Sequence, residues 1–170
     1  MILSKRIREF KKNLLKKENI ISFFIILILF LFDRISKLKI INEIDAGPKY
    51  VNDFINFDLI WNTGIGFGLL SSNSNLFYNS VTTVIGLVIL YLLIFAINSN
   101  RFEKFIITVI ISGALGNFYD RLYFKAVPDF IDLHYKSFHW FTFNIADMFI
   151  TIGLIALIIY GSLKQNNEKI

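Results

Sequence analysis

Residues 143–163 decide the fold of this chain, and they read FNIADMFITIGLIALIIYGSL. The run is mostly apolar, and a helix needs about 20 such residues to cross a bilayer. Its only charged residue is Asp147, which lies near the beginning of the run. A charged side chain at the edge of a bilayer is energetically costly, and it therefore indicates a functional site.

The composition also indicates an integral membrane protein rather than a soluble domain. Of the 170 residues, 55% are hydrophobic and only 18% are charged, which is unusual for a soluble domain. The chain has no cysteine, which excludes a disulfide, a thiolate nucleophile and a cysteine-bound zinc ion. The two histidines, His134 and His139, lack the repeated spacing of metal ligands, so we expect no metal site.

Three more segments are long and apolar enough to span a membrane. The expected spans are residues 20–41, 76–97, 102–122 and 144–163. Together they form one expected membrane domain, residues 20–163, between a basic tail at residues 1–19 and a short tail at residues 164–170. The length leaves little room for a further domain, and nothing in the sequence requires more than a monomer.

The placement of positive charge predicts the orientation of these spans. The net charge is +5, and the tail before the first span holds seven Lys and Arg residues. The short loop between the second and third spans adds Arg101 and Lys104, whereas the loop at residues 42–75 holds four acids. Because loops rich in Lys and Arg stay in the cytoplasm, we expect both termini inside and the two longer loops outside.

The basic tail has two interpretations. Leu3, Ile7, Phe10 and Leu14 would share one face of an amphipathic helix lying on the cytoplasmic leaflet. A disordered basic tail accounts for the same residues equally well. Contact with anionic lipid explains the charge better than nucleic acid does, so membrane lipid is an expected partner and nucleic acid is not.

The first outer loop carries the pattern of a strand. Ile55, Phe57, Leu59 and Trp61 occupy every second position, which is the period of a half-buried strand. Glycines at alternate positions from Gly64 onward allow sharp turns after it. The expected fold class is therefore an all-α integral membrane protein: four transmembrane helices with a small extracytoplasmic β-sheet between the first and second helices.

The unusual polar residues of the spans fall at one depth, near the outer interface. They are Asp33 and Lys37 in the first span, Asn117, Asp120 and Arg121 in the third, and Asn144 and Asp147 in the fourth. Each also has a purely structural interpretation. Asp33 and Lys37 are spaced for an ion pair, and Asn144 is of a residue type preferred as a helix cap. Asp120 and Arg121 could satisfy one another or cap a helix end.

Asp129 lies in the short segment before the last span and could meet Asp147 at the same depth. Two carboxylates that meet there suggest hydrolysis, with a water activated between them. Membrane acids also relay protons or bind cations in carriers and ion pathways. Such proteins usually bind near mid-membrane and contain internal repeats, and the sequence shows neither feature. A non-catalytic membrane scaffold is the third alternative.

Five segments resemble, in order, the sequence boxes of the bacterial lipoprotein signal peptidases, or type II signal peptidases. They are residues 33–37 (DRISK), 62–68 (NTGIGFG), 113–121 (GALGNFYDR), 127–132 (VPDFID) and 143–147 (FNIAD). The third and fifth segments are specific, whereas the first two would be weak alone. The resemblance covers residues 20–163 and leaves the basic tail outside it.

The resemblance implies a membrane aspartic endopeptidase of the bacterial inner membrane, with its active site at the outer face. Such an enzyme needs no cofactor, is inhibited by globomycin, and removes the signal peptide of a diacylglyceryl-modified prolipoprotein just before the lipidated cysteine. By motif position, Asp129 and Asp147 would be the catalytic pair. The expected supporting or substrate-binding residues are Asn62, Gly64, Asn117, Asp120, Arg121, Asn144, Asp33 and Lys37.

The sequence departs from the family pattern at three positions. Arg34 stands where the family commonly has Gln, and Ser36 where it commonly has Thr. Pro128 precedes Asp129, where an aliphatic residue is usual. Proline lacks an N–H and favours extended geometry in the residue before it, which affects the hydrogen bonding around Asp129.

Overall fold

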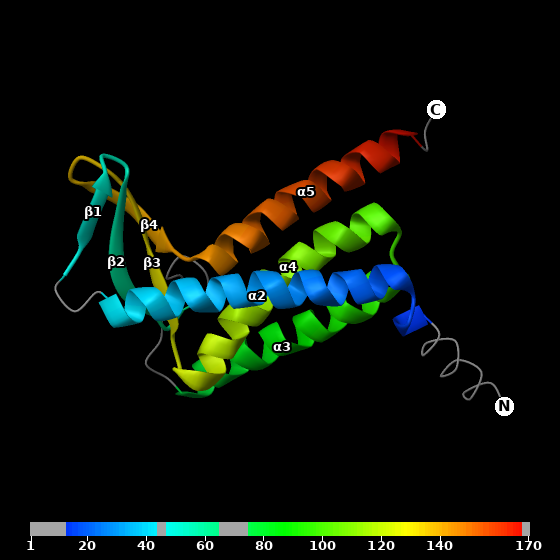
Figure 1. The fold of residues 1–170 in the computed structure, drawn as a ribbon, viewed down its shortest axis with the longest axis horizontal. Helices are drawn as coiled ribbons and strands as arrows, with labels where there is room; N and C mark the ends of the chain where they lie inside the picture. Colours follow the sequence, from blue (N-terminus) through cyan, green and yellow to red (C-terminus); the bar gives the residue numbers. More distant parts are fainter. Residues whose placement is uncertain (1–12, 44–46, 65–74, 168–170) are drawn as a thin grey trace.

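The computed structural model describes residues 13–43, 47–64 and 75–167, which form four long helices with a β-sheet at one end of the bundle (Figure 1). Both described chain ends lie at the opposite end of the bundle. Apart from Leu14, the face of the tail predicted to be amphipathic lies outside the described residues, as do the alternate glycines that follow Gly64.

The four long helices coincide with the four predicted spans. They are α2 (Lys17–Glu43), α3 (Asn75–Asn98), α4 (Arg101–Tyr123) and α5 (Ile145–Asn167). Each is long and apolar enough to cross a membrane. The predicted helical membrane architecture is therefore confirmed.

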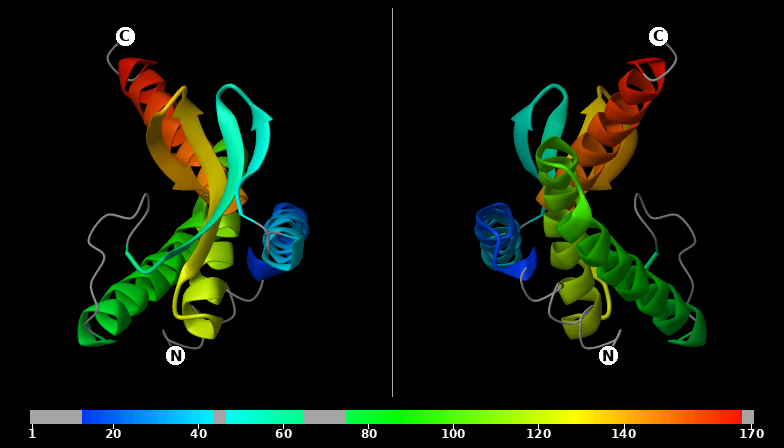
Figure 2. Two further views of the ribbon diagram at one scale, coloured as in Figure 1. Left: turned by 90° about the vertical axis from the view of Figure 1, so that its left-hand side faces the viewer. Right: turned by 90° about the vertical axis from the view of Figure 1, so that its right-hand side faces the viewer.

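The least apolar of the four helices is the central one. α4 packs against α2, α3 and α5 (Figure 2). As a result, 56% of its membrane-spanning window is buried, compared with 11–17% for the other helices. Protein rather than lipid covers much of α4, which explains why this helix can carry charged and amide side chains inside a membrane.

Two glycines of α4 allow its neighbours to come close. A Cβ on Gly113 would collide with the backbone oxygen of Ala146 in α5. A Cβ on Gly116 would collide with the carboxylate of Asp33 in α2. The missing side chains therefore bring α2 and α5 within reach of the polar residues that follow on α4.

The sheet has four antiparallel strands in the order β1-β2-β3-β4. β1 (Lys49–Asn52) and β2 (Ile55–Asn62) lie between α2 and α3, and β3 (Val127–Tyr135) and β4 (Phe138–Phe143) between α4 and α5. The predicted sheet and its strand at residues 55–62 are confirmed. The structure adds β3 and β4, which the sequence did not indicate, because the first six side chains of β3 are all buried and show no alternation.

The sheet is anchored to the ends of the first and last spans. Phe130 and Ile131 of β3 form a buried cluster with Ile40 of α2. Phe143 at the end of β4 and Ile145 at the start of α5 pack against the same cluster. This core fixes the position at which the chain leaves β4 and enters α5, and hence the position of the first turn of α5.

Candidate active site

The first turn of α5 is held by two reciprocal hydrogen bonds. Asn144 Oδ1 accepts the N–H of Asp147 at 3.1 Å, and Asp147 Oδ2 accepts the N–H of Asn144 at 3.2 Å. This is the geometry of a capping box, with Asp in the place usually taken by Glu or Gln. The structural interpretation of Asn144 as a helix cap is confirmed, and the cap fixes one carboxylate oxygen of Asp147.

Asp129 lies on β3 beside this turn, with only 2% of its surface exposed. Its Oδ1 accepts Asn144 Nδ2 at 2.5 Å, and its Oδ2 accepts Asn62 Nδ2 at 2.8 Å. Asn144 therefore joins the two aspartates, because its amide nitrogen binds Asp129 and its amide oxygen binds the backbone of Asp147. One residue thus contacts both carboxylates: the side-chain amide of Asn144 donates to Asp129, and its backbone N–H donates to Asp147.

Neither Pro128 nor the strand irregularity nearby removes Asp129 from the sheet. Asp129 is aligned with Ile60 of β2, and Pro128 with Trp61. The register shifts between Phe57 and Ile60, immediately beside Asp129. A bulge of this kind bends the strand and redirects side chains, and bulges are frequent next to active sites.

The second oxygen of Asp147 is linked to a buried lysine on α2. Asp147 Oδ1 accepts Asn117 Nδ2 at 2.7 Å, and Asn117 Oδ1 accepts Lys37 Nζ at 2.9 Å. The amide of Asn117 thus connects an ammonium group to Asp147 without direct contact between the two charges. Such a link orients the carboxylate and leaves it ionisable.

Lys37 is the centre of a buried cluster of charges between α2 and α4. Its Nζ lies 2.9 Å from Asp33 Oδ2, which confirms the predicted ion pair, and 2.8 Å from Asp120 Oδ2. Asp120 also binds Arg34, so two cations face two carboxylates. Asp33 Oδ1 in turn accepts the N–H of Ala146 at 3.0 Å. The cluster therefore ties the first turn of α5 to α2.

The suggestion that Asp120 and Arg121 satisfy one another is corrected by the structure. Asp120 binds Lys37 and Arg34 of α2, whereas Arg121 donates to the backbone oxygen of Gly64. Adjacent residues on a helix point in different directions, so their side chains meet different neighbours. Gly64 also donates its N–H to Asn62 Oδ1 at 2.8 Å, which places Arg121 in the same network as Asp129.

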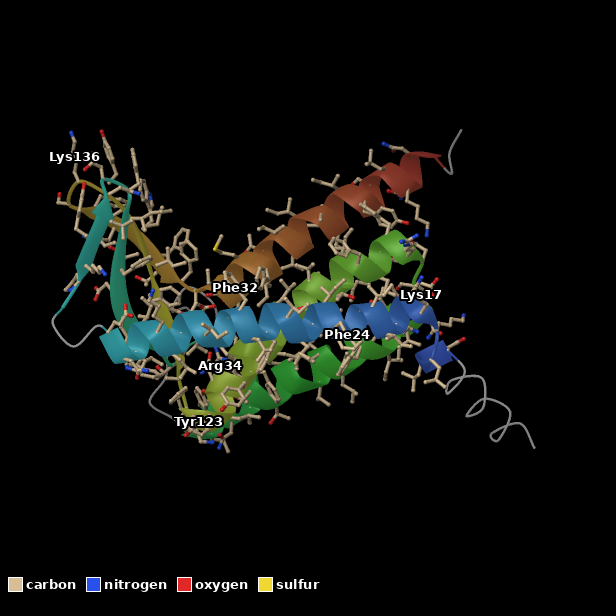
Figure 3. The ribbon with its side chains drawn as sticks, in the orientation of Figure 1. Lys17, Phe24, Phe32, Arg34, Tyr123 and Lys136 are labelled. Atoms are coloured by element: carbon tan, nitrogen blue, oxygen red, sulfur yellow. The ribbon has the colours of Figure 1, made fainter. Side chains whose placement is uncertain are left out.

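All the residues predicted from the sequence as catalytic or supporting belong to this one network of hydrogen bonds and ion pairs. Sequence reasoning missed Arg34, which was treated only as a departure from the family pattern. The signal available was its place three residues before Lys37, on the same face of the first span. Figure 3 labels Arg34 on α2, near the sheet.

Burial and a second carboxylate raise the pKa of Asp129 from 3.8 to about 7. Loss of hydration is the largest cause, and the negative charge of Asp147 is the next. Hydrogen bonds from Asn62 and Asn144, together with the charge of Lys37, act in the opposite direction. The pair can therefore hold one proton near neutral pH, which is the condition for hydrolysis by two aspartates.

Among the described residues, no group of three or more His, Asp or Glu side chains is placed to hold a metal ion.

A buried and a partly buried carboxylate, both bonded to one asparagine at one end of a membrane helix bundle, define the class of membrane aspartic peptidases. A family model described as "Signal peptidase (SPase) II" matches residues 25–163. The chain therefore belongs to the signal peptidase II family, and the family, fold class and enzyme class expected from the sequence are confirmed. Membership of this family favours a peptidase over a carrier or a scaffold.

Named relatives and a solved structure agree with this assignment. The chain is 46% identical over 151 residues to a "Lipoprotein signal peptidase" of Pelagibacter ubique (strain HTCC1062), covering 85% of this chain and 91% of the relative. It is 38% identical over 149 residues to the protein of the same name from Polynucleobacter necessarius, covering 85% and 90%. A solved bacterial membrane enzyme is 33% identical with a TM-score of 0.70, covering 88% of this chain and 91% of that one.

Proposed function

We propose that this chain removes the signal peptide from diacylglyceryl-modified prolipoproteins, cutting just before the lipidated cysteine, with Asp129 and Asp147 as the catalytic pair. Family membership supports the cleavage of lipoprotein signal peptides. The observation that supports the assignment of the pair is the position of Asn144, whose side-chain amide donates to the Asp129 carboxylate and whose backbone N–H donates to the Asp147 carboxylate. The finer substrate chemistry follows from the sequence resemblance.

The proposed reaction uses one proton shared by the two carboxylates. The ionised aspartate takes a proton from a water placed between them, and the resulting hydroxide attacks the scissile carbonyl. The protonated aspartate donates a hydrogen bond to the carbonyl oxygen and later helps to protonate the leaving amine. The two groups titrate as a pair, so the shared proton belongs to both.

Arg121 and the outer sheet have proposed roles toward the substrate. Arg121 is buried, and its Nε and Nη1 have no hydrogen-bond partner among the described residues. These donors can bind a carbonyl oxygen of the signal peptide. Trp61 and Trp140 on the sheet are each about half exposed, and aromatic side chains of this kind sit at headgroup level. The lipid chains of the substrate would enter sideways between helices.

The proposed topology places the site at the outer face of the bacterial cytoplasmic membrane, with both termini in the cytoplasm. Lys17 and the short α3–α4 connection lie at the end of the bundle opposite the sheet (Figure 3). Loops rich in Lys and Arg stay in the cytoplasm, which puts the sheet and the aspartate pair outside. We propose that residues 20–163 act as one domain and that a monomer is sufficient, because one chain supplies both aspartates.

Isosteric removal of each charge tests the catalytic pair. We expect Asp129→Asn and Asp147→Asn to abolish signal-peptide release, because neither amide can share the proton that activates water. The assay uses protein purified in detergent and a diacylglyceryl-modified prolipoprotein, with globomycin as an inhibitor of the wild-type protein. Asp53→Asn is the matched control, since Asp53 is exposed in the β1–β2 turn, where it accepts a hydrogen bond from Tyr50. Near-normal turnover by a catalytic variant would overturn the assignment.

A further inference from the structure

Lys104 is a buried lysine at the end of the bundle opposite the sheet. It lies in the first turn of α4, with 6% of its surface exposed. Its Nζ donates to Asn19 Oδ1 at 2.6 Å and to the backbone oxygen of Ile97 at 3.4 Å. Among the residues that the structure describes, no carboxylate forms an ion pair with it. Glu18 is near enough to act on Lys104 electrostatically but forms no ion pair with it. A buried charge without a directly bound counter-charge is costly, so an anion bound at Lys104 would offset that cost.

An apolar slot begins at Lys104 and runs between α2, α3 and α4. The slot has a volume of about 330 Å³, and Lys104 is the only charged residue among the described residues that line it. Its deeper walls are apolar, and they include Ile26 of α2, Leu93 of α3 and Ile111 of α4. Ile111 lies seven residues beyond Lys104 along α4, so the slot extends about 10 Å from the charge toward the middle of the membrane.

A second hollow adjoins the slot and is rich in positive charge. It has a volume of about 580 Å³ and shares Lys104 and Ser22 with the slot. Lys17, Arg101 and Lys104 line this hollow, and Glu18 is the only acid in the described part of its lining. Figure 3 shows Lys17 at the end of α2, where a lipid headgroup would lie. The N-terminal end of α4, at Arg101, adds the positive end of a helix dipole.

We propose that this end of the protein binds one anionic phospholipid, with its phosphate on Lys104 and one acyl chain in the apolar slot. The site goes beyond peptidase function and is remote from the aspartate pair. An acyl chain matches a narrow apolar slot between membrane helices, and a phosphate supplies the missing counter-charge. A free inorganic anion would leave the slot empty. A zwitterionic lipid would add a cation beside three cations and one acid, so charge complementarity selects an anionic headgroup.

Lipid binding by the purified wild-type protein tests the site. Phosphatidylglycerol and phosphatidylcholine with identical acyl chains are added to protein in detergent, and bound lipid is counted by native mass spectrometry. The apparent unfolding midpoint is followed in parallel. We expect phosphatidylglycerol to be retained in preference and to raise the midpoint, while inorganic phosphate does neither. Equal retention of the two lipids, or an equal shift with phosphate alone, would overturn the proposal.

Three variants assign the binding to the slot. Lys104→Met should weaken phosphatidylglycerol binding about tenfold, which corresponds to loss of one charge-assisted contact. Lys104→Arg should retain it, which separates loss of charge from loss of fold. Leu93→Trp should weaken it while keeping Lys104, because the larger side chain fills the slot. The control is Lys164→Met, since Lys164 lies outside both hollows. Unchanged binding in both Lys104→Met and Leu93→Trp would overturn the site.

Discussion

Lys37 and Lys104 are both buried lysines, and they lie at opposite ends of the helix bundle, but they differ in what neutralises their charge. Lys37 lies fully buried beside the aspartate pair, with Asp33 and Asp120 as counter-ions. Among the described residues, Lys104 forms hydrogen bonds with an amide and a backbone oxygen and no ion pair. At the catalytic end, therefore, the chain supplies every counter-charge and holds the site in a fixed geometry before substrate arrives. At the other end, the proposed counter-charge of Lys104 comes from a bound lipid.

Removal of each ammonium group is the strongest test of this difference. We expect Lys37→Met to destabilise the protein by about 3–5 kcal/mol, because it leaves the buried Asp33 without its cation and Asp120 with Arg34 alone. Lys104→Met should cost less than about 1 kcal/mol in lipid-free detergent, where only bonds to neutral groups are lost. Unfolding midpoints and denaturant titrations of the two purified variants provide the comparison. Equal losses would show that the two lysines are equivalent.

The helix caps at the two ends offer a second comparison. Asn144 caps α5 and bridges the aspartates, whereas Asn100 caps α4 by accepting the N–H groups of Phe102 and Glu103. Either change to Ala should cost about 1 kcal/mol of stability. Asn144→Ala should also lower kcat about 100-fold, because the two carboxylates lose their common support. Asn100→Ala is the control and should retain activity. Similar kcat values for the two variants would contradict the bridging role.

The raised pKa of Asp129 predicts the pH dependence of the catalytic end. The pair needs one proton, so kcat/KM should fall as pH rises through about 7. Asn62→Ala removes a hydrogen bond that favours the ionised form, so this fall should move to higher pH. Lys104→Met should leave the pH at which kcat/KM falls unchanged. Because folding raises the pKa of Asp129 above 3.8, the folded state binds the proton more tightly, and stability should decrease as pH rises from about 4 to about 7. A fall in kcat/KM that moves to lower pH in Asn62→Ala would be the opposite result.

The smallest effect is expected for a contact between a histidine and an aspartate at the surface of the sheet. His139 Nδ1 lies 2.8 Å from Asp132 Oδ2, but more than half of the His139 side chain is exposed. Water screens such a pair, so His139→Gln should change the unfolding free energy by less than about 1 kcal/mol. A chemical denaturation curve measures this directly. A loss of stability comparable to that of Lys37→Met would show that solvent exposure does not explain the difference between this contact and the buried ion pairs of Lys37.

Much of the fold and of the site follows from the sequence because both obey strong local constraints. A membrane span requires a long apolar run, and polar residues in such a run are costly enough to be conspicuous, as Asn117 and Asp147 are. The convergence of these residues at one depth followed from helix spacing and orientation. Their arrangement in one network is what the structure adds to that expectation.

Other features depend on contacts that local patterns do not encode. The partners of Asp120 come from α2, more than 80 residues earlier in the chain. β3 lacks the alternation of a half-buried strand because protein covers both of its faces. Lys104 was interpreted only as a signal of orientation, since a loop lysine is usually solvated. Its burial between α2, α3 and α4 depends on how three helices pack.

The dual use of Asn144 has a consequence for the assembly of the enzyme in the membrane. The amide that closes the first turn of α5 is also the one that joins Asp129 to Asp147. α5 is the last of the four helices to leave the ribosome, so a nascent chain has no assembled aspartate pair until its final span is in place. With the proposed catalytic pair, proteolytic activity would therefore require that the final span has folded against the other three.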